Sequence, residues 1–293
     1  MVERADCSRR LDERRFSMAK LIAEDGVGLY AESHGDGIPV ILSCGLCTTS
    51  ENFRPQVEAF VDAGVQLILW DYRGHGRSES PDDPAAYTLD RVLGDLGRVL
   101  DWAAPGRRAV LGGSSFGGLV SLHFAYRNPQ RVRGLILIAA GTGFKNPEAA
   151  ARWSKLTERS ASLIETEGSS AFVKSRAAPS LIGLRPDLPV ARSAADAIAR
   201  QDPVGLVHFQ RQIAAHVPAI IDELSEIDCP ALIAVGEKDD AFLRAADVLT
   251  ARLSRVERET IPGAGHMLNI DASEAFNAIA LRFLGKIATE TPE

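Results

Sequence analysis

The chain has 293 residues, of which 45% are hydrophobic and 25% are charged, and its formal net charge is −6. This balance is typical of a globular protein with a sizeable core, and it gives no reason to expect nucleic acid or a membrane surface as a partner. No apolar run approaches the roughly 18 residues of a membrane-spanning helix. The arginine-rich start lacks the apolar stretch of a secretory signal, so we expect residues 1–17 to be a disordered extension and the protein to be cytoplasmic.

Strand-like and helical patterns then alternate along the chain. The strand-like runs are 27–33, 39–43, 65–70, 109–112, 133–140, 231–235 and 256–261, and the helical patterns are 53–61, 89–102, 116–128 and 272–284. This alternation predicts a mostly parallel sheet with helices on both faces. The run 256–261 is shorter and more polar than the others, which favours a place near the sheet edge. Asp271 and Glu274 form a candidate capping box for the last helix.

The alternation stops between residues 143 and 225, where prolines punctuate helical patterns and no strand is evident. We expect about four helices inserted over the carboxyl edge of the sheet, where ligands bind in open α/β folds. The domain organisation is therefore a core of 18–142 and 226–293 with a helical lid of 143–225, and the alternative is an insertion without a role. Aromatic residues in helices are more often core, but four side chains are candidates for a substrate pocket: Phe144, Trp153, Phe172 and His208.

The stretch from Ala109 to Leu119 predicts a strand, a tight turn and the start of a helix. Its turn fits the G-x-S-x-G pattern, which holds a serine in a strained conformation at the carboxyl edge of a sheet. Gly113 and Gly117 stand two positions on either side of Ser115, where side chains would clash between strand and helix. Ser114 does not fit, because Phe116 occupies its second glycine position. Without further support, the turn could equally be a glycine- and serine-rich loop with no chemistry.

A serine nucleophile needs a base to take its proton, and the base needs an acid to orient it. In a strand–turn–helix arrangement both follow later in the chain, each after a strand. Asp239 follows the run 231–235, and His266 follows the run 256–261. The order Ser115, Asp239, His266 therefore predicts a catalytic triad. Asp240 and Glu237 are rival acids, and an aspartate in such a turn can also serve only as a cap.

Acyl transfer also needs backbone N–H groups directed at the developing oxyanion. We expect one from Phe116, which follows the nucleophile, and one from Leu46, in the loop after the run 39–43. The same loop contains a C-x-x-C pair, Cys44 and Cys47, which can indicate redox chemistry or half of a zinc site. No partner Cys/His pair follows at suitable spacing, so we expect no metal. Gly45, between the two cysteines, would let the backbone turn tightly toward the site. We prefer this interpretation of the segment to a redox or zinc role.

Together these segments resemble the α/β-hydrolase family. The matching pieces are Ser43–Leu46, Asp71–Ser78, Gly113–Gly117, Gly236–Asp239 and Gly263–His266, which span about residues 20–288. The resemblance implies an α/β-hydrolase fold with an eight-stranded, mostly parallel sheet flanked by helices and a helical lid after strand 6. It also implies the triad and oxyanion hole named above. The family usually has His-Gly where this chain has Cys44-Gly45, a histidine that generally supports the loop.

The expected function is a serine hydrolase that needs no cofactor and cleaves a carboxylic ester or lactone of a small, fairly apolar molecule. The lid is weakly similar to those of enol-lactonases and cofactor-free haloperoxidase-like esterases. Carbon–carbon bond hydrolysis or perhydrolysis on the same triad is the alternative within enzymes. Outside enzymes, the alternative is a ligand-binding receptor that kept the fold and hydrolyses its ligand slowly.

A homodimer is an option for the assembly of the protein. We expect His75 to be a turn residue and His123 to be packed.

Overall fold

The structure is a computed structural model and describes residues 16–290. Its eight strands form one sheet in the order β1-β2-β4-β3-β5-β6-β7-β8. The strands are β1 (Phe16–Ile22), β2 (Gly28–His34), β3 (Ile38–Ser43), β4 (Val65–Trp70), β5 (Ala109–Ser114), β6 (Val132–Ile138), β7 (Ala231–Gly236) and β8 (Val256–Ile261). β1 and β2 pair antiparallel, as do β2 and β4, and the pairs from β4 to β8 are parallel. The expected eight-stranded, mostly parallel sheet is confirmed.

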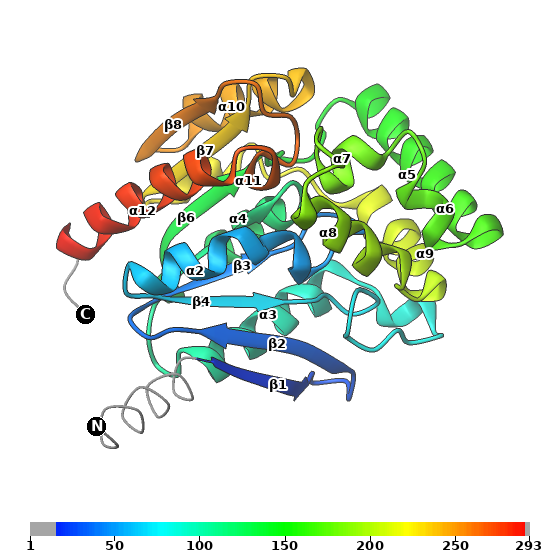
Figure 1. The fold of residues 1–293 in the computed structure, drawn as a ribbon, viewed down its shortest axis with the longest axis horizontal. Helices are drawn as coiled ribbons and strands as arrows, with labels where there is room; N and C mark the ends of the chain where they lie inside the picture. The colour runs from blue at the N-terminus through cyan, green and yellow to red at the C-terminus, as the bar shows by residue number, and fades with distance from the viewer. Residues whose placement is uncertain (1–15, 291–293) are drawn as a thin grey trace.

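Helices cover both faces of this sheet (Figure 1). α2 (Arg54–Asp62) and α12 (Ser273–Glu290) lie on one face, and α3 (Leu89–Ala103) and α4 (Phe116–Arg127) lie on the other. α10 (Asp240–Arg252), which the sequence analysis did not identify, packs on β7 and β8. The central strands are buried on both faces, as in β6, where every residue is buried. This explains why β5, β6 and β7 are apolar along their whole length rather than alternating.

Three expectations are wrong in detail. Phe16 and Ser17, which we assigned to the extension, belong to β1 and pair with His34 and Ser33; the rest of the extension, residues 1–15, lies outside the described residues. The last helix begins at Ser273, after the one-turn α11 (Leu268–Asp271). Asp271 does not form a capping box, because its carboxylate accepts hydrogen bonds from the amides of Leu184 and Gly265 instead.

The segment between β6 and β7 is helical, and in Figure 1 it gathers beyond the carboxyl ends of the strands. It contains five α-helices rather than about four: α5 (Pro147–Glu167), α6 (Ser169–Val173), α7 (Ala178–Ile182), α8 (Pro189–Ala199) and α9 (Pro203–Gln212). An apolar cluster within it, which includes Phe172 and Leu206, also includes Cys47 and Met267 from loops of the sheet domain. The inserted helices therefore pack directly on two loops at the carboxyl edge. Among the described residues, every helix is too short or too polar to cross a membrane.

Candidate active site

Ser115 stands at the turn between β5 and α4 in a strained backbone conformation. Its φ of 54° and ψ of −111° lie where residues other than glycine are rarely found. Its N–H donates to the Ile138 carbonyl over 2.8 Å, and its carbonyl accepts from the amides of Gly118 and Leu119 at the start of α4. These bonds hold the turn at the edge of the sheet. The Ser115 side chain is partly exposed, whereas Ser114 is buried.

The glycines on either side of Ser115 are required by close backbone contact. A Cβ added at Gly113 would lie 2.1 Å from the Ser43 carbonyl oxygen, and a Cβ added at Gly117 would lie 2.1 Å from the same atom. Both distances are far below van der Waals contact, so only glycine fits at either position without moving the end of β3. The geometric reason we gave for the G-x-S-x-G pattern is thus visible in the structure.

His266 and Asp239 lie together although they follow different strands. His266 Nδ1 is 2.7 Å from Asp239 Oδ2, and the two side chains are 12% and 10% exposed. The Asp239 residue is the N-cap of α10, but its side chain makes no capping hydrogen bond and is therefore available to the imidazole. The Phe242 ring packs beside the imidazole, with 4.4 Å between ring centroids. Contact with a carboxylate at Nδ1 leaves Nε2 as the nitrogen that can accept a proton.

The two rival acids have other positions. Asp240 is exposed and is the first residue of α10. Glu237 is also exposed, and its Oε2 accepts a hydrogen bond from the Gly263 amide, within the turn that leads to His266. The structure therefore brings His266 to Asp239 rather than to either neighbour.

The turn carrying Ser115 and the loop carrying His266 are adjacent. Ser114 Oγ lies 3.8 Å from Met267 Sδ, which places neighbours of both residues in contact. Within residues 16–290 the Ser115 hydroxyl makes no hydrogen bond, so the serine–histidine hydrogen bond is not formed in this structure. Hydrogen bonds between catalytic groups are often long in enzymes without substrate and shorten when it binds.

The expected oxyanion donors lie on either side of Ser115. Phe116 is the first residue of α4, where an N–H group has no acceptor within the helix. The loop containing Leu46 passes close to the serine, since a Cβ added at Gly45 would lie 3.6 Å from Ser115 Cβ. Neither the Leu46 amide nor the Phe116 amide donates to another group in the described part of the chain. Both N–H groups are thus available to a ligand oxygen.

The C-x-x-C pair does not form a disulfide, because Cys44 and Cys47 are free, and both are buried. Burial raises the pKa of the Cys44 thiol well above its usual range and also raises that of Cys47, which disfavours the reactive thiolate. In the described part of the chain no group of three or more His, Cys, Asp or Glu side chains could hold a metal ion. The two cysteines therefore pack as small apolar side chains, Cys44 in the core of the sheet domain and Cys47 in the apolar cluster of the insertion.

The loop that lacks the usual histidine is supported by a different one. His75 is buried, and its Nε2 accepts a hydrogen bond of 3.2 Å from the Cys47 amide. Burial lowers the pKa of His75 to about 4, so the ring is neutral near pH 7 and can act as this acceptor. We expected only a turn residue at this position. His123 is packed as expected: it lies in α4, is 5% exposed and contacts the Pro218 carbonyl through Nε2.

Of the four residues expected to line a substrate pocket, only Phe144 and Trp153 are in ring contact with each other in the described residues. Phe172 is buried in the apolar cluster of the insertion. Phe144 is 43% exposed and stacks on Trp153, whose indole N–H donates to the Ala214 carbonyl. His208 stacks on Tyr87. In the described residues no hydrogen bond or ring contact joins these four to Ser115 or His266, so their role stays a prediction.

Two residues of the inserted segment that the sequence analysis missed do reach the loops of the site. The Phe209 ring lies 5.4 Å from the ring of Phe116 and 4.6 Å from that of His75, between centroids. The Gln201 side chain binds the Cys47 carbonyl. The neighbour of Phe209, His208, was a candidate from the sequence, but no sequence pattern pointed to Gln201.

Comparison with known proteins agrees with this geometry. A family model described as the alpha/beta hydrolase fold matches residues 38–273. A protein of Variovorax paradoxus assigned as the carbamate hydrolase RutD is 31% identical over 278 residues, covering 89% of this chain and 97% of its own length. A protein of Bacillus subtilis assigned as a 2-succinyl-6-hydroxy-2,4-cyclohexadiene-1-carboxylate synthase is 26% identical and covers 91% of this chain and 98% of its own.

Solved structures are similar over nearly the whole chain. A thermophilic esterase from Thermogutta terrifontis has a TM-score of 0.77 and 25% identity, with 93% of this chain and 99% of that one covered. The enol-lactonase from Burkholderia xenovorans has a TM-score of 0.77 and 24% identity, with 92% and 100% covered, and so supports the fold alone. From the matched family model, the sheet order and the strained serine turn, we conclude that this chain belongs to the alpha/beta hydrolase fold family.

Proposed function

We propose that the protein is a serine hydrolase that cleaves a carboxylic ester or lactone of a small, fairly apolar molecule through an acyl-enzyme on Ser115. The observation that carries the proposal is the 2.7 Å contact between His266 and Asp239, beside a serine held at a φ of 54°. An aspartate that only capped α10 would not need its carboxylate on an imidazole. A serine without a chemical role would not need a strained backbone.

In the proposed reaction His266 Nε2 takes the proton of the Ser115 hydroxyl as Oγ bonds to the carbonyl carbon. The carbonyl electron pair moves onto oxygen, where the Leu46 and Phe116 amides stabilise the negative charge. Asp239 holds the imidazole in position and stabilises its charged form. The imidazolium then protonates the leaving alkoxide, and a water molecule deprotonated by His266 releases the acid by the reverse steps.

The apolar preference is supported by the surroundings of the site. Leu46, beside the proposed oxyanion hole, packs against the apolar cluster of the insertion, and Met267, next to His266, is part of that cluster. We propose that residues 143–225 act as a lid, because these helices stand over the carboxyl edge and contribute that apolar wall (Figure 1). Under the lid the acyl group of the substrate would meet side chains that favour hydrocarbon over charge.

A carbamate is the second candidate substrate, because a relative assigned as a carbamate hydrolase is 31% identical over most of both chains. The same nucleophile and oxyanion hole would serve: the carbonyl carbon would carry nitrogen in place of carbon, and the alcohol would leave as it does from an ester. Carbon–carbon bond hydrolysis and perhydrolysis on this triad remain alternatives within the enzyme class. Parallel assays of p-nitrophenyl esters, simple lactones, alkyl carbamates and vinylogous diketones would rank these candidates by kcat/KM.

The test of the nucleophile is covalent labelling with a fluorophosphonate probe. We expect rapid labelling of the wild type and of Ser114→Ala, no labelling of Ser115→Ala, and loss of ester turnover only in the last. Retained turnover in Ser115→Ala would refute the proposal. Labelling lost only in Ser114→Ala would identify Ser114 as the nucleophile instead. A cytoplasmic location and a homodimer stay predictions; cell fractionation and light scattering, respectively, would test them.

A further inference from the structure

Cys47 is held at both of its backbone polar groups by side chains from other parts of the chain. Its φ of 61° lies in the left-handed region, which a residue other than glycine occupies only when its surroundings hold it there. Its N–H donates to His75 Nε2 over 3.2 Å, and its carbonyl accepts from Gln201 Nε2 over 2.8 Å. Both bonds are buried, which strengthens them relative to bonds exposed to water.

Gln201 joins two loops that the sheet alone does not connect. It lies between α8 and α9, and its side-chain Oε1 accepts from the Gly76 amide over 2.9 Å while its Nε2 binds Cys47. Its own carbonyl accepts from Ser169 Oγ, which ties the residue to α6. Gln201 is only 3% exposed, and removing its side chain would leave the buried Cys47 carbonyl and the part-buried Gly76 N–H without these partners.

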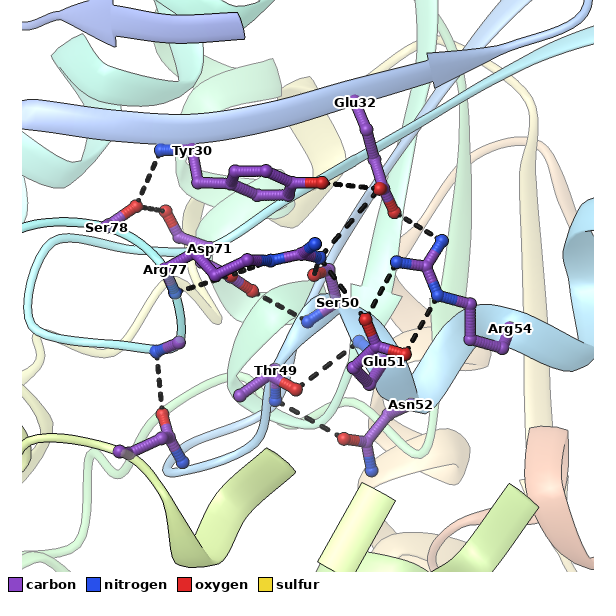
Figure 2. A network of polar contacts seen from close by, with 12 residues as sticks. Tyr30, Glu32, Thr49, Ser50, Glu51, Asn52, Arg54, Asp71, Arg77 and Ser78 are labelled. Carbon is purple, nitrogen blue, oxygen red and sulfur yellow. Dashed lines mark hydrogen bonds and ion pairs between the residues drawn. The ribbon is translucent and has the colours of Figure 1, made fainter. Parts of the chain in front are cut away.

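The outer side of the same two loops is already fixed by a separate network, shown in Figure 2. Asp71 Oδ1 accepts from the Ser50 amide and Oδ2 accepts from the Arg77 amide, which fastens the segment after β3 to the segment after β4. Arg77 also lies over the Tyr30 ring, 3.6 Å from its centroid. This network holds residues 50 and beyond. Closer to Ser115, Thr48 donates from its N–H and from Oγ1 to the Gly45 carbonyl, and in the described structure the hydrogen bonds that tie this turn to other segments are those at Cys47.

The histidine side of the arrangement is fixed by ring packing. The Phe209 ring meets the His75 ring edge-on at 4.6 Å and the Phe116 ring at 5.4 Å. His75 Nδ1 faces the Arg73 carbonyl at 3.4 Å, which assigns the ring proton to Nδ1 and leaves Nε2 as the acceptor. His75 therefore holds the peptide before Cys47 through its N–H, and Gln201 holds the peptide after Cys47 through its carbonyl.

We propose that Gln201 is a positioning residue for the oxyanion hole: by holding the Cys47 carbonyl it fixes the turn in which the Leu46 amide is aimed at the oxygen bound on Ser115. This inference rests on the proposed function. The inserted segment would then be part of the catalytic framework as well as a cover, and it would replace the support that the family usually takes from the histidine before the glycine of this loop. A small rotation of the loop would reduce oxyanion stabilisation without changing the apolar wall.

The test compares Gln201→Leu, which removes both hydrogen bonds, with Gln201→Glu, which keeps the acceptor for Gly76 and loses the donor to Cys47. Gln212→Leu is the matched control, because Gln212 is exposed at the end of α9 and its side chain makes no hydrogen bond in the described structure. The substrate is p-nitrophenyl butyrate. An alkyl trifluoromethyl ketone of the same chain length, which forms a tetrahedral adduct with a serine, measures oxyanion stabilisation directly.

We expect Gln201→Leu to lower kcat by about 10–10²-fold, which approaches the loss of one oxyanion donor. The affinity for the trifluoromethyl ketone should fall by the same factor, while KM changes less than about threefold. Gln201→Glu also loses the bond to Cys47 and places a carboxylate oxygen beside its carbonyl, so it should show at least as large a loss of the same pattern, and Gln212→Leu should match the wild type. A side chain that only stabilised the fold would lower the urea midpoint without this split between kcat and KM.

Unchanged kcat and ketone affinity in folded Gln201→Leu would overturn the inference, as would losses confined to KM. Failure of both Gln201 variants to fold would also overturn it, because the residue would then maintain the fold rather than aim the amide. A wild type that is not labelled by fluorophosphonate and does not turn over the ester would remove the proposed function itself. These outcomes are distinguishable, since the last is read from the wild type alone.

Discussion

Gly117→Ala places a methyl group where α4 crosses the end of β3. In an ordinary exposed helix position the same change stabilises a protein by up to about 1 kcal/mol, because alanine favours helices over glycine. At Gly117, however, the new Cβ would lie 2.1 Å from the Ser43 carbonyl oxygen, 2.7 Å from the Ser43 carbonyl carbon and 2.8 Å from the Cys44 carbonyl oxygen. All three are backbone atoms, so no side-chain rotation can relieve the contact.

Relief requires α4 and the end of β3 to separate by roughly 1 Å, and overpacking of this kind costs about 1–3 kcal/mol or more. We expect Gly117→Ala to lower the free energy of unfolding by about 3 kcal/mol. The displaced segment leads into Leu46, and a shift of about 1 Å at a reacting centre can cost on the order of 10²-fold in rate. We therefore expect a similar fall in kcat/KM for ester hydrolysis.

Urea unfolding and p-nitrophenyl butyrate hydrolysis measure the two effects. Gly94→Ala is the matched control, because Gly94 is an exposed glycine within α3 and an added Cβ there meets nothing within 4 Å. That variant should be as active as the wild type and slightly more stable. If Gly117→Ala were as stable and as active as Gly94→Ala, close contact between the serine turn and the end of β3 would not be needed for stability or for activity.

Asp239→Asn should reduce kcat by about 10³–10⁴-fold, because an amide can no longer stabilise the imidazolium, whereas Asp240→Asn should change it little; equal losses in the ester assay would reopen the choice of acid. The pKa of His75 is lowered by burial from 6.5 to about 4, so the unfolded chain binds a proton between these values and the folded chain does not. The free energy of unfolding should therefore fall by about 3 kcal/mol as pH drops from 6.5 to 4. Below pH 4 the contribution of His75 should not change further. The decline of the urea midpoint with falling pH should be absent in His75→Gln and present in His216→Gln, which alters an exposed histidine. The same decline in His75→Gln as in the wild type would contradict the reasoning.

Much of the fold could be predicted because its signals are local. The apolar runs of β5, β6 and β7 and the glycine spacing around Ser115 depend only on neighbours in the chain. β1 was less visible. Phe16, Met18 and Ile22 are 43%, 63% and 52% exposed, so this edge strand has no clear buried face and exists through pairing with β2. Its pattern alone did not distinguish it from an extension.

The sequence by itself predicted a serine, an acid and a histidine in that order, because each follows a strand that its own residues specify. It favoured Asp239 but left Asp240 and Glu237 as rivals, and only the tertiary structure shows which carboxylate reaches the imidazole across the sheet edge. The support of the loop that contains Leu46 and Cys47 was decided by the tertiary structure entirely: Gln201 and Cys47 are 154 positions apart and meet only when the inserted helices pack on the sheet domain. Hydrogen bonds between such distant residues leave no periodicity or spacing in the chain, because their geometry exists only after folding.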